Sequence, residues 1–173
     1  MSPAPLIVTA ELPPAIFAWA DALRRTHYSP DRNQLAAHVT LFHALPPSLE
    51  GEARTRLALM ARVWGPVPAV LSGIMDLGRG TALAIQSPAM LAIRAALADE
   101  LHGSLTTQDG HLPRLHVTIQ NKVLRETARN LQAELAEAPF PRSFRFSGLA
   151  LHRYLGGPWE PAGKWSFRGK EGG

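Results

Sequence analysis

Two strand-like stretches of the chain carry the same tripeptide, His-Val-Thr, at residues 38–40 and 116–118. Side chains at alternate positions of a strand point to the same face. His38 and Thr40 are therefore predicted to share a face, with Phe42 next along it, while the intervening valine packs on the opposite side. Any fold for this chain has to accommodate two strands that each present an imidazole beside a hydroxyl.

The second tripeptide follows the same alternation. His116, Thr118 and Gln120 are predicted to lie on one face of their strand. Lys122 shares that face if the alternation is strict, and Arg114, two residues before the histidine, is also expected on it. Phe42, Arg114, Gln120 and Lys122 are thus candidates for substrate contacts, and the charged Arg114 and Lys122 are candidates for contacts with a phosphate.

The two tripeptides occupy equivalent places in a repeated pattern. Each half of the chain is predicted to run strand, helix, motif strand, helix, strand. From Pro5 to His38 is 33 residues, and from Thr81 to His116 is 35, which indicates an internal duplication. Besides the motif strands, we expect strands at 6–9, 67–77, 81–87, 142–154 and 165–169, and helices at 15–27, 49–64, 88–102 and 124–137. Ser48 is the expected N-cap of the second helix.

This order predicts an α+β fold in which two lobes bring the motif strands face to face. Helices between strands also suit a doubly wound parallel sheet, but no glycine-rich phosphate loop follows any strand. We therefore expect one domain over residues 1–173, with lobes at about 1–78 and 79–173 and with strands free to exchange between them.

The composition excludes several classes of site. The chain has no cysteine, which rules out disulfides, thiolate metal sites and cysteine nucleophiles, and fits a reducing cytoplasm. No apolar run is long enough to span a bilayer, and the N-terminal segment has no charged leader, so we expect a cytoplasmic protein without a membrane partner. A net charge of +4 favours a phosphate-bearing partner but does not by itself indicate nucleic-acid binding.

Paired histidines suit chemistry at phosphorus. If the lobes are related by an approximate two-fold axis, His38 and His116 converge on one cleft. Histidine has an ordinary pKa near 6.5, so one imidazole can act as general base while the other acts as general acid. The hydroxyls of Thr40 and Thr118 can donate to the non-bridging phosphate oxygens, and no metal is required. The alternative is that both histidines are hydrogen-bonded structural residues, as strand histidines often are.

Two His-x-Thr motifs in a duplicated, cysteine-free chain of this length resemble the two-histidine (2H) phosphoesterase superfamily, in its bacterial 2′-5′ RNA ligase and RNA 2′,3′-cyclic phosphodiesterase branch. The resemblance implies a bilobal fold with pseudo-two-fold symmetry and a central cleft between two antiparallel sheets with flanking helices. It also implies hydrolysis of cyclic phosphodiesters without a cofactor, with catalytic roles for His38 and His116 and phosphate-binding roles for Thr40 and Thr118. The histidine that acts as acid and the one that acts as base stay unassigned.

One position departs from this family pattern. Related enzymes often carry an arginine shortly after the second motif, where this chain has Gln120, Asn121 and Lys122. A lysine cannot form the planar bidentate contact that an arginine makes, so Lys122 would bind a phosphate with a different geometry. Tyr28 and Trp159 are the aromatic candidates for stacking on a base, with Trp159 expected in a loop.

The expected function is hydrolysis of a 2′,3′-cyclic phosphate, at RNA 3′ ends or on nucleotides, to a 2′-phosphate. No obligate protein partner is evident from the sequence. A non-catalytic module that binds RNA ends or nucleotides is the alternative from another class. A 2′-5′ RNA ligase or a 2′-5′ phosphodiesterase is the alternative within the enzyme class.

Overall fold

A computed structural model describes residues 4–138, 141 and 143–171 of the chain. Its elements are, in order, β1 (Leu6–Glu11), α1 (Pro14–His27), β2 (Val39–Leu45), the 3₁₀ helix η1 (Pro47–Leu49), α2 (Glu50–Val63), β3 (Val67–Asp76), β4 (Thr81–Gln86), α3 (Pro88–Glu100), β5 (His116–Gln120), α4 (Arg125–Glu137), β6 (Ser143–Phe146), β7 (Gly148–Tyr154) and β8 (Trp159–Ser166).

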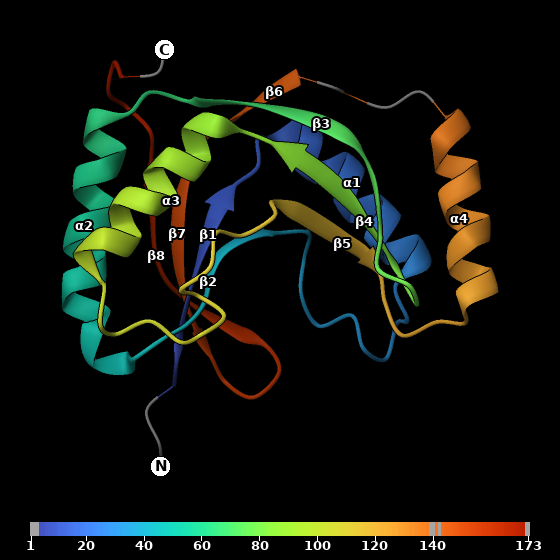
Figure 1. Cartoon of the computed structure of the whole chain (residues 1–173), viewed down its shortest axis with the longest axis horizontal. Helices are drawn as coiled ribbons and strands as arrows, with labels where there is room; N and C mark the ends of the chain where they lie inside the picture. Colours follow the sequence, from blue (N-terminus) through green and yellow to red (C-terminus); the bar gives the residue numbers. More distant parts are fainter. Residues whose placement is uncertain (1–3, 139–140, 142, 172–173) are drawn as a thin grey trace.

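The strands form two four-stranded antiparallel sheets, with orders β2-β1-β7-β8 and β5-β4-β3-β6. Helix α2 lies against β7 and β8 of the first sheet, and α4 lies against β3 and β4 of the second. Figure 1 shows α2 and α3 on one side of the molecule and α1 and α4 on the other. The predicted α+β class, with two antiparallel sheets and flanking helices, is confirmed.

Local sequence explains where the helices begin. Pro14 and Pro88 occupy the first helical positions of α1 and α3, where the missing N–H costs nothing. The hydroxyl of Ser87 caps α3 by accepting a hydrogen bond from the N–H of Met90 at 3.2 Å. The predicted cap at Ser48 is wrong, because Ser48 lies inside η1 and α2 begins only at Glu50.

The last strands of the two halves exchange places. β3 pairs with β4 and β6, while β7 pairs with β1 and β8. The single long strand predicted over 142–154 is therefore wrong. The chain leaves one sheet after β6 and enters the other at β7, with Ser147 at the crossing (Arg142 lies outside the described residues). The orders β2-β1-β7 and β5-β4-β3 correspond, as pseudo-two-fold symmetry requires.

A bulge interrupts the first motif strand just after its threonine. Thr40 lies opposite Thr9, and Phe42 lies opposite Val8, so that Leu41 is the extra residue on β2. An extra residue reverses the alternation of faces beyond it. Phe42 therefore lies on the opposite face from Thr40.

The second motif strand has the same bulge at the equivalent place. Thr118 lies opposite Ala82, and Gln120 lies opposite Thr81, which leaves Ile119 as the extra residue on β5. Both bulges come three residues after the motif histidine. The duplication predicted from element order thus extends to the details of strand pairing.

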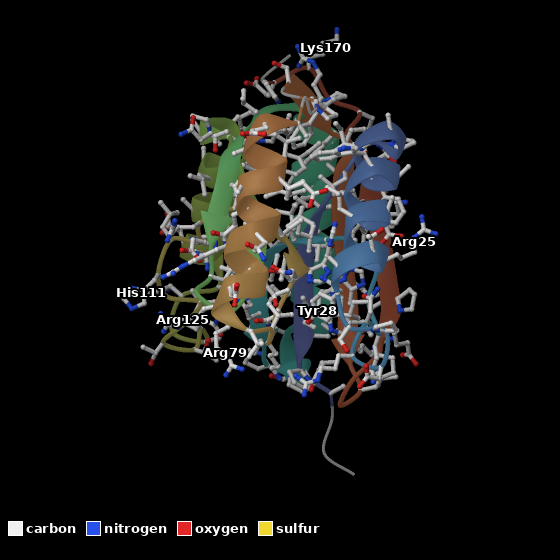
Figure 2. All side chains as sticks on the ribbon, turned by 90° about the vertical axis from the view of Figure 1, so that its right-hand side faces the viewer. Arg25, Tyr28, Arg79, His111, Arg125 and Lys170 are labelled. Atoms are coloured by element: carbon white, nitrogen blue, oxygen red, sulfur yellow. The ribbon has the colours of Figure 1, made fainter. Side chains whose placement is uncertain are left out.

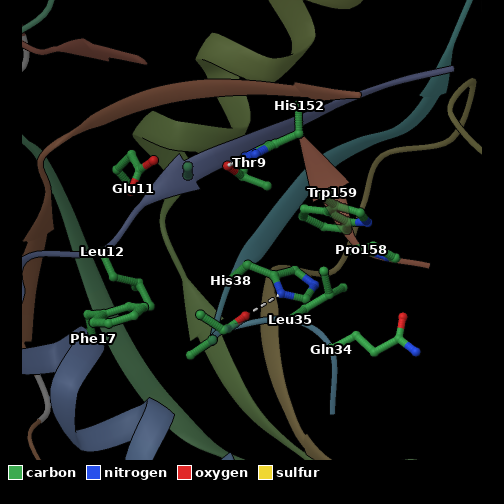
Figure 3. A pocket seen from close by; sticks show the side chains of 13 residues that line it. Thr9, Glu11, Leu12, Phe17, Gln34, Leu35, His38, His152, Pro158 and Trp159 are labelled. Atoms are coloured by element: carbon green, nitrogen blue, oxygen red, sulfur yellow. Dashed lines mark hydrogen bonds between the residues drawn. The ribbon is translucent and has the colours of Figure 1, made fainter. Parts of the chain in front are cut away.

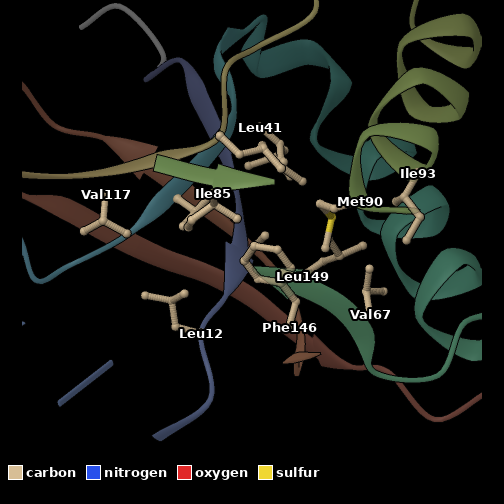
Figure 4. Close-up of a cluster of buried hydrophobic side chains, with 14 of the residues drawn as sticks. Leu12, Leu41, Val67, Ile85, Met90, Ile93, Val117, Phe146 and Leu149 are labelled. Carbon is tan, nitrogen blue, oxygen red and sulfur yellow. The ribbon is translucent and has the colours of Figure 1, made fainter. Parts of the chain in front are cut away.

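One continuous hydrophobic core joins the sheets and the helices. Figure 4 shows residues of both sheets packed together, among them Leu41, Ile85 and Phe146, with Ile93 of α3 against them. The valines of the two motifs, Val39 and Val117, belong to the same cluster and are at most 1% exposed. Burial of these side chains anchors each motif strand while its histidine and threonine face away from the core. No helix in the described part of the chain is long and apolar enough to cross a membrane.

Candidate active site

The two His-x-Thr motifs lie on edge strands of different sheets. His38 immediately precedes β2, and His116 is the first residue of β5. The histidine and threonine of each motif are partly exposed, and the valine between them is buried. Each motif strand therefore presents an imidazole and a hydroxyl on one face, as predicted from alternation.

Both imidazoles are held in the same way. Nδ1 of His38 lies 2.8 Å from the carbonyl oxygen of Ala36, and Nδ1 of His116 lies 2.6 Å from the carbonyl oxygen of Arg114. A carbonyl only accepts, so Nδ1 carries the hydrogen in both rings. This leaves Nε2 of each ring to accept or donate a proton, and it fixes the ring orientation from the backbone two residues earlier.

A cavity of about 300 Å³ borders His38 and is lined by Thr9 and Glu11 of β1 (Figure 3). Trp159 of β8 packs on the His38 ring with centroids 4.6 Å apart, and on the His152 ring with centroids 5.1 Å apart. Nε2 of His152 is hydrogen-bonded to the hydroxyl of Thr9 at 2.9 Å. Phe17 lines the cavity at the start of α1.

This environment changes the protonation of His38. Burial is the largest influence and lowers its pKa to about 4, the hydrogen bond to Ala36 opposes the shift, and the positive charge of Arg24 adds to it. Burial likewise lowers the pKa of His152. The His38 imidazole is consequently neutral at pH 7, with a lone pair on Nε2.

A second cavity, of about 340 Å³, lies between β2 and the loop that precedes β5. Thr40 and His116 both line it, together with Arg114, His43 and His111. The exposed Arg114 thus lines the same cavity as Thr40 and His116, and it stays a candidate for an additional phosphate contact. The first cavity serves only the first motif, so the two halves differ in what surrounds their histidines.

The loop before β5 is fixed to the edge of β2 by a buried carboxylate. Asp109 is 1% exposed and accepts hydrogen bonds from the backbone N–H groups of His43 and Ala44, each at 2.8 Å. These bonds help to hold the Asp109 pKa below its ordinary value against the opposing effect of burial. His43 also points toward this carboxylate, with Nδ1 3.3 Å from Oδ1.

Three of the predicted substrate contacts do not lie where alternation places them. Phe42 is 0% exposed and belongs to the core, because the bulge at Leu41 turns it inward. Gln120 is 2% exposed and accepts a hydrogen bond from the Thr81 hydroxyl at 2.9 Å, because the equivalent bulge turns it inward. Lys122 lies beyond the end of β5 in the left-handed conformation (φ 56°), so strand alternation no longer applies to it.

The two aromatic candidates have different surroundings. Trp159 begins β8 rather than lying in a loop, and it lines the cavity beside His38. Tyr28 ends α1 (Figure 2), and its ring lies 4.1 Å from the guanidinium carbon of Arg24. Of these two candidates, Trp159 is therefore the one that borders the cavity beside His38.

Sequence patterns did not single out several residues around the motifs. Thr9 and His152 come from ordinary strands, and Arg24, Arg94 and Asp109 are charged residues, a class that is rarely fully buried. The signal available for Arg24 was its place on the apolar stripe of α1, with Ile16 and Ala20. Among residues 4–138, 141 and 143–171, no group of three or more histidine or acidic side chains is arranged to hold a metal ion.

Comparisons with known proteins agree with this geometry. The model of the 2′-5′ RNA ligase superfamily matches residues 12–158. The structure of TT0787 from Thermus thermophilus aligns with a TM-score of 0.67 at 19% identity and covers 96% of this chain and 100% of its own. E. coli LigT complexed with 3′-AMP aligns with a TM-score of 0.61 at 17% identity, covering 96% and 99%. No curated protein matches significantly.

Proposed function

Because the chain belongs to the 2′-5′ RNA ligase superfamily, we propose that it is a metal-independent phosphodiesterase that opens 2′,3′-cyclic phosphates at RNA ends or on nucleotides. Membership in this superfamily supports an enzyme acting on phosphoesters. The observation that carries the finer proposal is the matched pair of imidazoles, each held through Nδ1 by the carbonyl two residues earlier, with a threonine two residues later.

The reaction follows from this arrangement. Nε2 of one histidine accepts a proton from water as the water oxygen attacks phosphorus. Nε2 of the other histidine donates a proton to the 3′-oxygen as its bond to phosphorus breaks, so that the product is a 2′-phosphate. The hydroxyls of Thr40 and Thr118 donate to the non-bridging oxygens, where negative charge accumulates in the transition state.

Substrate binding changes the electrostatics of the site. The neutral form of His38 is ready to accept a proton, whereas a bound phosphate adds a negative charge that favours the protonated form of either ring. Arg114, beside Thr40 and His116, is placed to contact the same phosphate. In this proposal Arg114 supplies the positive charge that related enzymes often obtain from an arginine shortly after the second motif. Lys122 is less suited to this role because it lies beyond the end of β5.

The cavity beside His38 suits the nucleoside that carries the phosphate. Phe17 and Trp159 supply aromatic walls, and Gln34 supplies a polar edge at its rim. Its volume of about 300 Å³ falls at the lower end of the range for small-molecule pockets. The likeness to LigT, whose structure contains 3′-AMP, supports a nucleotide substrate.

Assays with adenosine 2′,3′-cyclic phosphate test the proposal. His38→Ala and His116→Ala are each expected to lower turnover by at least about a hundredfold, because each removes one partner in proton transfer. His102→Ala, at an exposed position just after α3, is the matched control and should keep wild-type turnover. Turnover should also survive a chelator. Activity that persists in both motif variants would refute the proposal.

The same assay separates the alternatives. Salt-sensitive binding of the cyclic nucleotide without any product would favour a non-catalytic module that recognises RNA ends. Formation or cleavage of 2′-5′ linkages in an oligonucleotide, with no opening of the cyclic phosphate, would instead favour the ligase or the 2′-5′ phosphodiesterase.

A further inference from the structure

Two buried arginines lie on the corresponding helices of the two halves. Arg24 lies on α1, between β1 and the first motif, and Arg94 lies on α3, between β4 and the second. Each is 3% exposed. Each guanidinium carbon lies 4.1 Å from the centroid of an aromatic ring, that of Tyr28 for Arg24 and that of Phe42 for Arg94. Each half therefore contains one buried guanidinium.

Arg24 joins the two motifs. Its Nε donates to the side-chain oxygen of Asn33 at 2.9 Å and to the carbonyl of Leu35 at 3.0 Å, in the segment that leads to His38. Its Nη1 donates at 2.7 Å to the carbonyl of Thr118, the threonine of the other motif. One side chain thus connects the approach to the first histidine with the second motif strand.

Arg94 makes the reciprocal connection. Its Nε donates to the carbonyl of Leu41 at 3.0 Å, directly after Thr40 of the first motif. Its Nη2 donates to the carbonyl of Asp109, in the loop that leads to His116. The two arginines therefore cross between the halves in opposite directions.

We propose that Arg24 and Arg94 are positioning residues that set the separation of the two His-x-Thr motifs across the cleft. β2 and β5 belong to different sheets and do not pair with each other, so no shared strand ladder fixes their spacing. In-line chemistry between two histidines depends on that spacing, and a misplacement of about 1 Å can cost roughly a hundredfold in rate. This inference rests on the proposed function.

Arginine suits this role better than other residues. Its planar fork reaches several acceptors in fixed directions, whereas a lysine ammonium is a point charge on a flexible stem. Neither arginine forms a salt bridge with a carboxylate of the described residues, and both donate mainly to carbonyl oxygens. Burying a charge in this way is costly, and an apolar side chain often serves stability as well. Geometry, rather than stability, therefore accounts for a buried guanidinium at these two positions.

The test uses the conservative variants Arg24→Lys and Arg94→Lys, which keep the charge but lose the fork. With adenosine 2′,3′-cyclic phosphate we expect kcat to fall roughly ten- to a hundredfold while KM changes less than about threefold. Arg25→Lys is the matched control, because Arg25 is next on α1 and its side chain is 69% exposed, pointing outward in Figure 2. Its kinetics should equal those of the wild type.

A second readout needs no turnover. In the wild type, inorganic phosphate is expected to shift the NMR signals of the His38 and His116 imidazoles with one common Kd, because both rings flank the same anion. In either lysine variant the two rings are expected to report two different Kd values, because they no longer flank one anion at the same spacing. If the arginines had a purely structural role, the two lysine variants would have lower thermal stability but the same common Kd and the same kcat as the wild type.

The outcomes distinguish the two proposals. A wild-type protein that neither turns over the cyclic nucleotide nor binds phosphate at both rings would contradict the proposed function itself. A wild type that does both, with lysine variants that match it in kcat and in phosphate binding, would overturn the positioning role alone. If Arg24→Lys does not fold, Asn33→Ala serves as the second variant, because it removes one acceptor of the Arg24 guanidinium. An unchanged kcat in Asn33→Ala would likewise overturn the positioning role of Arg24.

Discussion

At the scale of single residues, the environment of His38 is the most informative part of the site. The ring is partly buried, and Trp159 covers one side of it. We expect NMR titration to give His38 a pKa near 4, well below the ordinary 6.5. Trp159→Ala should raise this pKa toward 6.5, because it admits water to the ring.

The control for this titration is Leu155→Ala, which changes an exposed side chain in the neighbouring turn. It should leave the His38 pKa near 4. Two outcomes would contradict this explanation. One is a wild-type His38 pKa close to the ordinary value. The other is a Trp159→Ala variant whose His38 pKa equals that of the wild type.

The same burial predicts how stability depends on pH. The folded pKa of His38 lies below the unfolded one, so the unfolded chain binds the proton more readily. The stability that His38 contributes through this lowered pKa is complete above about pH 6.5 and is lost as the pH falls toward 4. The loss amounts to about 3 kcal/mol. Urea unfolding of the wild type from about pH 7 to about pH 4 measures this slope.

His38→Ala should flatten that pH dependence even if its stability at neutral pH also changes. His102→Ala, which alters an exposed ring, should keep the wild-type slope. Equal slopes in the wild type and His38→Ala would contradict the linkage.

Single-residue reasoning from the sequence identified the motifs and missed their neighbours for a definite reason. His38, Thr40, His116 and Thr118 precede the bulges, so strict alternation holds for them. Phe42 and Gln120 follow the bulges, and nothing in their local sequence marks the extra residue. Thr9 and His152 meet only because β1 pairs with β7, a contact between residues 143 positions apart.

At the scale of elements, the crossing between β6 and β7 decides how the sheets are assembled. The segment has continuous strand propensity, which is why the sequence predicts one strand there. Gly148 marks the crossing, because a Cβ at this position would lie 2.3 Å from the carbonyl oxygen of Trp165 on β8. Only glycine permits that approach between β7 and β8.

Gly148→Ala is therefore expected to destabilise the fold by about 1–3 kcal/mol, since backbone has to move to admit the methyl group. Gly51→Ala is the matched control, because a Cβ on this α2 residue would meet nothing within 4 Å. Alanine is also the better helix former, so this variant should be neutral or stabilised by up to about 1 kcal/mol. Urea unfolding compares the two, and equal stabilities would contradict the role of Gly148.

At the scale of the whole molecule, the sequence repeat and the sheets divide the chain differently. The repeat predicts lobes at about 1–78 and 79–173, while each sheet contains strands from both ranges. A fragment over 1–78 would keep the β1–β2 pair and lose β7 and β8, and two-stranded sheets are marginal in water. The same exchange places one motif strand from each half at a sheet edge, and these two edge strands, β2 and β5, lie next to each other.

We therefore expect the chain to unfold as one cooperative unit, and neither half to fold alone. Two tryptophans lie in each half, Trp19 and Trp64 in the first and Trp159 and Trp165 in the second. Tryptophan fluorescence thus reports both halves, and its urea transition should coincide with that of far-UV circular dichroism. Two separated transitions, or a separately expressed 1–78 fragment with cooperative unfolding, would show that the lobes are independent. The separation of the motifs would then depend on a lobe interface rather than on the exchanged strands and the crossing arginines.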